Sequence, residues 1–246
     1  MSTTAPVPRQ TEAGPAVPAV PEGRPSGTAR TLRAPSLVAG AGLLLMAVLS
    51  AFGIFGPLDS LMTPGDAPGT AANVAASEML FRLGTASLIV VAVLDIIVAG
   101  ALFEVFASVN RSVSAMAAGF RVAYAGVFFV AITHLLEVPK HLDDGARILR
   151  AVDAFDALWK AGLILFAVHL LLIGYLAVRS GFMARIFGFL LVAAGGGYLI
   201  DGMGAVLVPA YSVSVAQFAF VGEVALIFWL LIKGRRTIPA THRTVQ

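Results

Sequence analysis

The chain has 246 residues, of which 58% are hydrophobic and 13% are charged, and its formal net charge is +3. Soluble domains carry roughly a quarter charged residues, so this composition and a mean hydropathy of +0.88 exclude water as the main solvent. The chain contains no cysteine, which excludes disulfides, thiolate catalysis and thiolate metal sites.

The first 35 residues differ from the rest because they are rich in Pro, Ala, Thr and Gly and contain almost nothing that could build a core. This composition predicts a disordered tail. A cleaved secretory signal is the alternative interpretation, but its charged region would be unusually long, and its apolar region would exceed the usual length of roughly 7 to 15 residues. We therefore expect an uncleaved first helix.

Six apolar runs follow, each long enough for a helix that crosses a hydrocarbon core of roughly 30 Å. The runs show no strand-like alternation, and a spanning backbone must satisfy its own hydrogen bonds, so helices are favoured over a barrel. The runs cover residues 37–55, 79–106, 115–136, 158–178, 186–208 and 213–232. The sequence thus predicts an all-α, polytopic bundle of six transmembrane helices over residues 36–236, followed by a short polar tail at 237–246.

The basic residues between the runs predict the orientation, because short loops rich in Lys and Arg stay on the cytoplasmic side. On one side of the predicted bundle these residues are Arg30, Arg33, Arg111, Arg179, Arg185, Lys233, Arg235 and Arg236. The opposite loops carry Asp59 and Asp66, a middle loop of mixed charge, and a last loop without charge. We therefore expect a multi-pass protein of the cytoplasmic membrane with both termini in the cytoplasm.

The middle loop contains a segment at 145–155 whose apolar residues have helical spacing. This segment could lie flat on the outer membrane surface. It could equally extend the fourth helix, and a lid over a substrate is the third interpretation.

Four ionisable residues are predicted to lie close to the membrane midplane, at about 1.5 Å per residue from the helix ends: Asp95, Arg121, His169 and Glu223. Such residues are costly in hydrocarbon and usually face the bundle interior. Asp95 and Arg121 lie on adjacent helices at similar depths, which predicts an ion pair. His169 and Glu223 form a second predicted pair, which would favour the charged imidazole.

A second polar group is predicted nearer the outer surface: Glu78, Arg82, His134, Glu137, Asp156, Lys160 and Asp201. Six of these residues form pairs at i, i+3 or i, i+4, so each pair can neutralise itself along one helix face. Two interpretations of the buried charges stay open. They either fasten the helices together, or they line a polar cavity that opens to the outside and binds a ligand.

Neither a metal nor a cofactor is expected. His134, Glu137 and His141 have a ligand-like spacing, but Pro139 interrupts the helix between them, and a zinc site needs three or four converging ligands. The run Gly195-Gly196-Gly197 lies inside an apolar segment and lacks the Lys-Ser/Thr of a phosphate loop. Such glycines favour close helix contact, together with Gly188, Gly202 and Gly204.

Several different short motifs follow one another along the chain. They are Asn73-Val74-Ala75 with Glu78 and Phe81-Arg82, then Gly119-Phe120-Arg121, then Gly174-Tyr175-Leu176 with Arg179-Ser180-Gly181-Phe182 and Arg185, then Gly197-Tyr198-Leu199-Ile200-Asp201, and last Gly222-Glu223 with Trp229 and Lys233-Gly234. Over residues 33–236 this pattern resembles bacterial membrane proteins grouped as domain of unknown function 4386. Ala184 departs from it, since these proteins tend to have proline before the arginine, and this puts the rigidity of that turn in doubt. The resemblance implies a polytopic membrane protein, gives weight to Arg82, Arg121, Asp201 and Glu223, and implies no activity.

Three functions fit these observations. We expect an integral membrane protein without catalysis, with an envelope, partner or sensor role and a polar bundle interior. The first alternative is a small-solute or proton-coupled transporter component, and the second is an intramembrane enzyme that uses His169 and Glu223 as acid and base on a lipid. The expected partners are the lipid bilayer and a small solute, and no nucleic acid.

Overall fold

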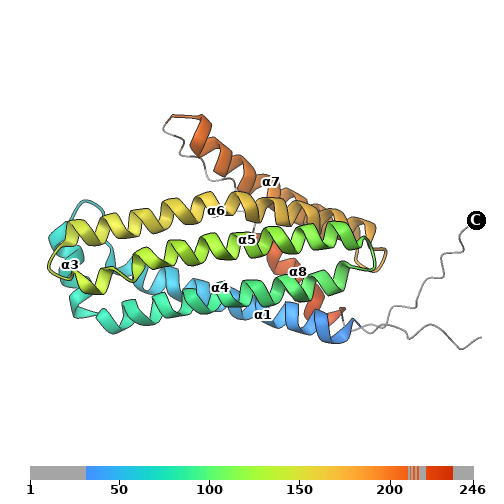
Figure 1. The fold of residues 1–246 in the computed structure, drawn as a ribbon, viewed down its shortest axis with the longest axis horizontal. Helices are drawn as coiled ribbons and strands as arrows, with labels where there is room; N and C mark the ends of the chain where they lie inside the picture. The colour runs from blue at the N-terminus through green and yellow to red at the C-terminus, as the bar shows by residue number, and fades with distance from the viewer. Residues whose placement is uncertain (1–31, 210, 212, 214, 216–219, 235–246) are drawn as a thin grey trace, which may run out of the picture.

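The computed structural model describes residues 32–209, 211, 213, 215 and 220–234. Most of the predicted tail at 1–35 and all of the predicted tail at 237–246 lie outside the described residues. Within the described part of the chain every regular element is a helix (Figure 1). The all-α prediction is confirmed for this part.

The helices run mostly along the length of the molecule and alternate in direction (Figure 1). In chain order they are α1 (Arg33–Gly53), a π-helical turn η1 (Ile54–Leu58), α2 (Asp59–Leu61), α3 (Ala67–Ala76), α4 (Glu78–Phe106), α5 (Arg111–Leu135), a 3-10 turn η2 (Val138–Lys140), α6 (Gly145–Arg179), α7 (Arg185–Leu207) and α8 (Phe220–Ile232).

Among the described residues, five helical stretches are long and apolar enough to cross a membrane. They are Arg33–Leu61, Glu78–Phe106, Arg111–Lys140, Gly145–Arg179 and Arg185–Leu207. These stretches indicate a multi-pass membrane protein.

The predicted count of six spanning helices is not confirmed, because the described part of α8 has 13 residues. At about 1.5 Å per residue it is roughly 20 Å long, shorter than a hydrocarbon core of roughly 30 Å. The sequence placed its start near Val213, but neither Val213 nor Val215 is helical. The backbone N–H of Val215 instead donates to the carboxylate of Asp201 at 2.9 Å.

Polar side chains cap the N-termini of three helices, because each accepts a hydrogen bond from a backbone N–H of the first turn. Asp66 begins α3, Asn110 begins α5 and Asp144 begins α6. The start of α6 at Gly145 means that residues 145–155 extend this helix. The extension of the fourth predicted helix is therefore the interpretation that the structure bears out.

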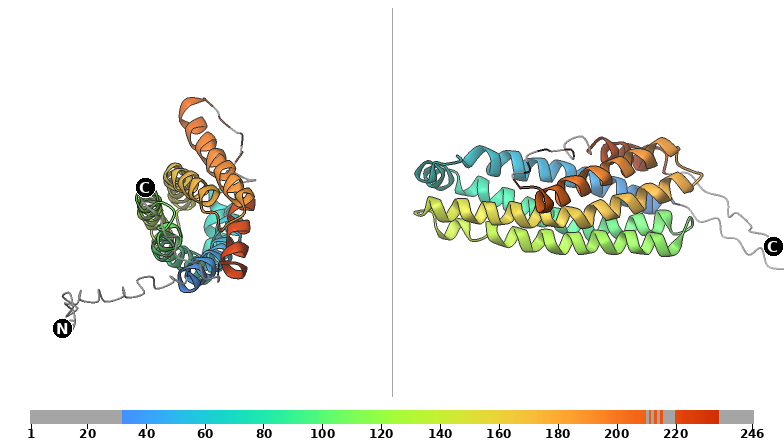
Figure 2. Two further views of the ribbon diagram at one scale, coloured as in Figure 1. Left: turned by 90° about the vertical axis from the view of Figure 1, so that its right-hand side faces the viewer. Right: turned by 90° about the horizontal axis from the view of Figure 1, so that it is seen from above.

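The helices form a closed ring in which each packs against the next: α1, α4, α5, α6, α7, α8 and again α1. The end-on view in Figure 2 shows this ring, and Figure 1 shows α7 leaning away from the bundle towards its C-terminal end. Since α8 is short, it joins α1 to α7 over only part of the length of the bundle.

Glycines bring α6 and α7 into backbone contact. A Cβ atom added to Gly174 would lie 2.8 Å from the carbonyl oxygen of Gly188, and one added to Gly195 would lie 2.8 Å from that of Ala167. A Cβ on Gly202 would lie 2.6 Å from the Ile164 side chain. The expected close contact is confirmed at these positions of α7.

The two described ends of the chain lie at the same end of the bundle. A Cβ added to Gly234, just after α8, would lie 2.7 Å from the Cβ of Ser36 in the first turn of α1. The expectation that this end faces the cytoplasm rests on the basic residues alone.

Candidate functional site

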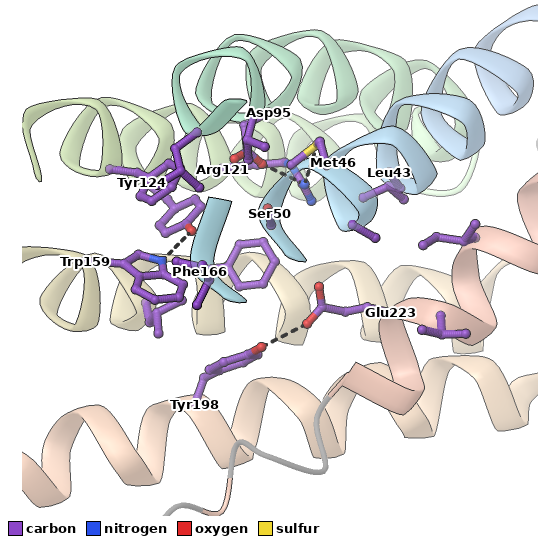
Figure 3. Close-up of a pocket in the computed structure, with 18 residues that line it drawn as sticks. Leu43, Met46, Ser50, Asp95, Arg121, Tyr124, Trp159, Phe166, Tyr198 and Glu223 are labelled. Carbon is purple, nitrogen blue, oxygen red and sulfur yellow. Dashed lines mark hydrogen bonds and ion pairs between the residues drawn. The ribbon is translucent and has the colours of Figure 1, made fainter. Parts of the chain in front are cut away.

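A cavity of about 250 Å³ lies inside the ring, where its walls come from α1, η1, α4, α5, α6, α7 and α8 (Figure 3). It is partly open rather than sealed. Its polar lining residues are Ser50, Asp95, Arg121, Tyr124, Trp159, Tyr198 and Glu223, and the others are Leu43, Met46, Ala47, Ile54, Leu88, Val91, Phe128, Leu163, Phe166, Val224 and Ile227.

Asp95 of α4 and Arg121 of α5 form a buried ion pair on one side of the cavity. The carboxylate Oδ1 lies 2.7 Å from the guanidinium Nη2, and the side chains are 1% and 3% exposed. Asp95 lies eleven residues before the end of α4, and Arg121 lies ten residues after the start of α5. Both are therefore about 15 Å from the same end of the bundle, and the predicted pair is confirmed.

His169 of α6 contacts Arg121 and not Glu223, so the second predicted pair is wrong. Its Nε2 lies 3.1 Å from Nη1 of Arg121, and its Nδ1 lies 2.8 Å from the carbonyl oxygen of Ala117. A guanidinium only donates, so Nε2 accepts, and Nδ1 must carry the proton donated to the carbonyl. The hydrogen bonds thus assign His169 as a neutral imidazole that positions Arg121.

The guanidinium of Arg121 also contacts an aromatic ring and a sulfur atom, but not all of its N–H groups have a hydrogen-bond partner. It lies 5.3 Å from the ring centroid of Phe166, and Nη2 lies 3.9 Å from Sδ of Met46. Nε of Arg121 and Oδ2 of Asp95 have no hydrogen-bond partner within the described residues. Buried polar atoms are normally paired, so this end of the cavity favours water or a polar ligand.

Glu223, in the first turn of α8, lies across the cavity from the Asp95–Arg121 pair (Figure 3). Its carboxylate accepts a hydrogen bond from the Tyr198 hydroxyl of α7 at 3.2 Å. Within the described residues no cationic side chain lies at ion-pair distance from it. Glu223 is therefore a half-buried carboxylate that shares its site with a neutral phenol.

Aromatic rings cover the wall between these two polar groups. Phe166 stands at its centre, with ring centroids 5.0 Å from Tyr124 and 5.8 Å from Tyr198. Trp159 donates from Nε1 to the Tyr124 hydroxyl at 3.1 Å, and its ring lies 6.0 Å from that of Phe128. This wall combines apolar surface with faces that attract cations.

The outer polar group does not line the cavity. Glu78 pairs with Arg82 at 2.6 Å and Asp156 pairs with Lys160, as their spacing predicted. Glu137, however, pairs with Lys140 at 2.7 Å rather than with His134, because η2 turns Lys140 towards it.

Asp201, the last member of the outer group, accepts a hydrogen bond from the Tyr211 hydroxyl at 2.8 Å. This bond to a carboxylate raises the pKa of Tyr211. Among the described residues no cluster of three or more His, Asp or Glu side chains is placed to hold a metal ion.

The aromatic members of the site were not predicted. Tyr124 and Phe128 at i, i+4, and Phe155 and Trp159 at the same spacing, mark one face of α5 and one face of α6. That spacing is the signal available in the sequence. In an apolar helix, however, a lipid-facing aromatic pair has the same spacing.

The comparison with known families supports the resemblance. The family model described as domain of unknown function (DUF4386) matches residues 38–234. The chain belongs to the DUF4386 family. One relative of this chain is an uncharacterised protein of Archaeoglobus fulgidus, 33% identical over 144 residues, which are 58% of this chain and 79% of that protein. Since that organism is an archaeon, the bacterial assignment is not confirmed. No solved structure matches the chain.

Proposed function

We propose that this DUF4386 protein is an integral membrane protein that binds a small molecule in the midplane cavity without transforming it. The observation that carries the proposal is a cavity of about 250 Å³ with a polar group at each end and aromatic rings between them. Mostly apolar walls with a few convergent polar groups are typical of ligand sites. Such a site suits a sensor or carrier role.

The contacts of His169 argue against acid–base catalysis by the predicted pair. Both imidazole nitrogens are engaged, one by Arg121 and one by the Ala117 carbonyl. A general base needs a lone pair directed at the substrate proton. Glu223 is separate from His169 and has Tyr198 as its partner.

Transport of the bound molecule is the second candidate, and the partial opening of the cavity favours it. A carrier must expose its site to one side of the membrane and then to the other. Uptake of the bound compound into proteoliposomes would distinguish transport from sensing, because a sensor binds the compound without moving it.

The proposal is tested with the fluorescence of Trp159, which lines the cavity. The chain has two tryptophans, so Trp229→Phe leaves Trp159 as the single reporter. In a non-ionic maltoside detergent we expect saturable quenching by at least one of three small aromatic probes: neutral neopentylbenzene, cationic benzyltrimethylammonium or anionic phenylacetate.

A matched pair of variants on α1 locates the binding. Ala47 lines the cavity, whereas its neighbour Val48 is 59% exposed on the outside of the bundle. Ala47→Phe should fill the cavity and weaken binding at least tenfold, while Val48→Phe should leave it unchanged. Equal binding by both variants, or no saturable binding of any probe, would contradict the proposed function.

A further inference from the structure

The charges that line the cavity do not balance. Its ionisable lining residues within the described part of the chain are Asp95, Arg121 and Glu223. Asp95 and Arg121 neutralise each other at 2.7 Å. Among the described residues the hydrogen-bond partner of Glu223 is the hydroxyl of Tyr198. A carboxylate away from water is costly unless it takes up a proton or a positive charge compensates it, and a cationic ligand near Glu223 would supply that charge.

The wall of the cavity beside Glu223 suits a cationic group with an apolar substituent. Tyr198, which binds the Glu223 carboxylate, also meets Phe166 edge to face at 5.8 Å. The guanidinium of Arg121 already lies over the Phe166 ring at 5.3 Å. Aromatic faces next to a carboxylate are the usual surroundings of bound ammonium groups.

The donor set of the cavity does not suit a divalent metal ion. A metal ion such as Mg²⁺ or Ca²⁺ requires about six or more oxygen ligands, and most of the lining side chains are apolar. A volume of about 250 Å³ lies just below the roughly 300 to 1,000 Å³ typical of drug-sized ligands. The cavity therefore fits a small organic cation.

We propose that the cavity binds a small lipophilic monocation, an ammonium group carrying an aromatic or alkyl body, with Glu223 as its counterion. The proposal rests on the proposed function and adds the chemical class of the ligand. In the bound state the ammonium lies between the Glu223 carboxylate and the rings of Tyr198 and Phe166. The apolar body lies along the Trp159 side of the cavity.

The test compares two probes of the same shape that differ in charge. Benzyltrimethylammonium carries a quaternary nitrogen where neopentylbenzene carries a quaternary carbon. Titrated against the Trp229→Phe protein in maltoside detergent, the cation should quench Trp159 with at least tenfold higher affinity than the neutral compound.

Glu223→Gln in the same background should lower the affinity for the cation at least tenfold. The affinity for neopentylbenzene should stay within about twofold of its value in the Trp229→Phe protein. Retained binding of the neutral probe shows that the variant is folded. The matched control is Glu78→Gln, which removes an exposed carboxylate of α4 that pairs with Arg82. This control should change neither affinity.

Equal affinity for both probes, or a cation affinity that Glu223→Gln leaves unchanged, would overturn the monocation proposal. If neopentylbenzene or phenylacetate binds and Ala47→Phe abolishes that binding, the proposed function holds and only the ligand class is wrong. If no probe binds saturably, both proposals are overturned.

Discussion

At the scale of single residues, Arg121 organises the polar interior. Its guanidinium contacts a carboxylate, an imidazole nitrogen and an aromatic face, contributed by Asp95, His169 and Phe166. A planar group with five N–H donors can make these contacts at once, whereas the single ammonium of a lysine cannot. The residue therefore connects α5 to both α4 and α6 in the interior of the bundle.

The Asp95–Arg121 pair leads to a prediction on stability. Asp95→Asn leaves the Arg121 charge buried without a counterion, which typically costs about 3 to 5 kcal/mol. Glu78→Gln also removes an α4 carboxylate from an ion pair with arginine, but those side chains are 36% and 53% exposed. It should cost no more than about 1 kcal/mol. Thermal unfolding in detergent measures both variants.

A double variant separates the effect of the unpaired buried charge on stability from the effect of the altered side-chain shapes. Asp95→Asn with Arg121→Gln removes both charges, so we expect it to be more stable than Asp95→Asn alone. Equal unfolding temperatures for Asp95→Asn and Glu78→Gln would show that the buried pair contributes no more than a surface pair.

The sequence predicted one of the two buried contacts correctly and the other wrongly, and the difference has a physical reason. Counting residues gives the depth of a side chain, and α4 and α5 are joined by a short turn, so Asp95 and Arg121 meet. His169 and Glu223 also have similar depths, but α7 packs between α6 and α8 in the ring. The depth of a side chain does not say towards which neighbouring helix it points. Tyr198 of α7, rather than His169, is the residue that contacts Glu223.

At the scale of elements, backbone contact between α6 and α7 depends on specific glycines. A Cβ added to Gly188 would lie 2.5 Å from Cγ2 of Val178 and 2.7 Å from the carbonyl oxygen of Gly174. Gly188→Ala should therefore destabilise the bundle by about 1 to 3 kcal/mol, since the helices must separate.

Gly196, on the same helix, gives the matched control. No atom of the described residues lies within 4 Å of a Cβ built there. Gly196→Ala should leave stability unchanged or raise it by up to about 1 kcal/mol, because alanine is the better helix former. The prediction fails if thermal unfolding shows the same change for both variants.

Apolar runs in the sequence located the long helices but not the short one. The run at 213–232 is apolar throughout, and hydropathy gives no reason for a helix to begin late. The Asp201 carboxylate binds the backbone N–H of Val215 and thereby competes with a helix at that position. The described part of α8 begins at Phe220, five residues after Val215.

At the scale of the whole molecule, the ring explains why the cavity escaped prediction. Its lining residues come from seven elements and are spread from Leu43 to Ile227. Each contributes one to four side chains, and no local pattern marks them as a set. The sequence did predict that the interior is polar, since the cost of a charge in hydrocarbon holds for any arrangement of the helices.

The orientation of the ring in the membrane is predicted by its basic residues and can be tested by thiol labelling. The chain has no cysteine, so a single substitution gives a unique thiol. Ser108 is exposed between α4 and α5, next to Arg111, and Asp143 is exposed between η2 and α6 at the other end of the bundle. With a membrane-impermeant maleimide, Asp143→Cys should react in intact spheroplasts, and Ser108→Cys only after permeabilisation. The reverse pattern would place the termini outside, and reaction of both thiols in intact spheroplasts would mean that α5 does not cross the membrane.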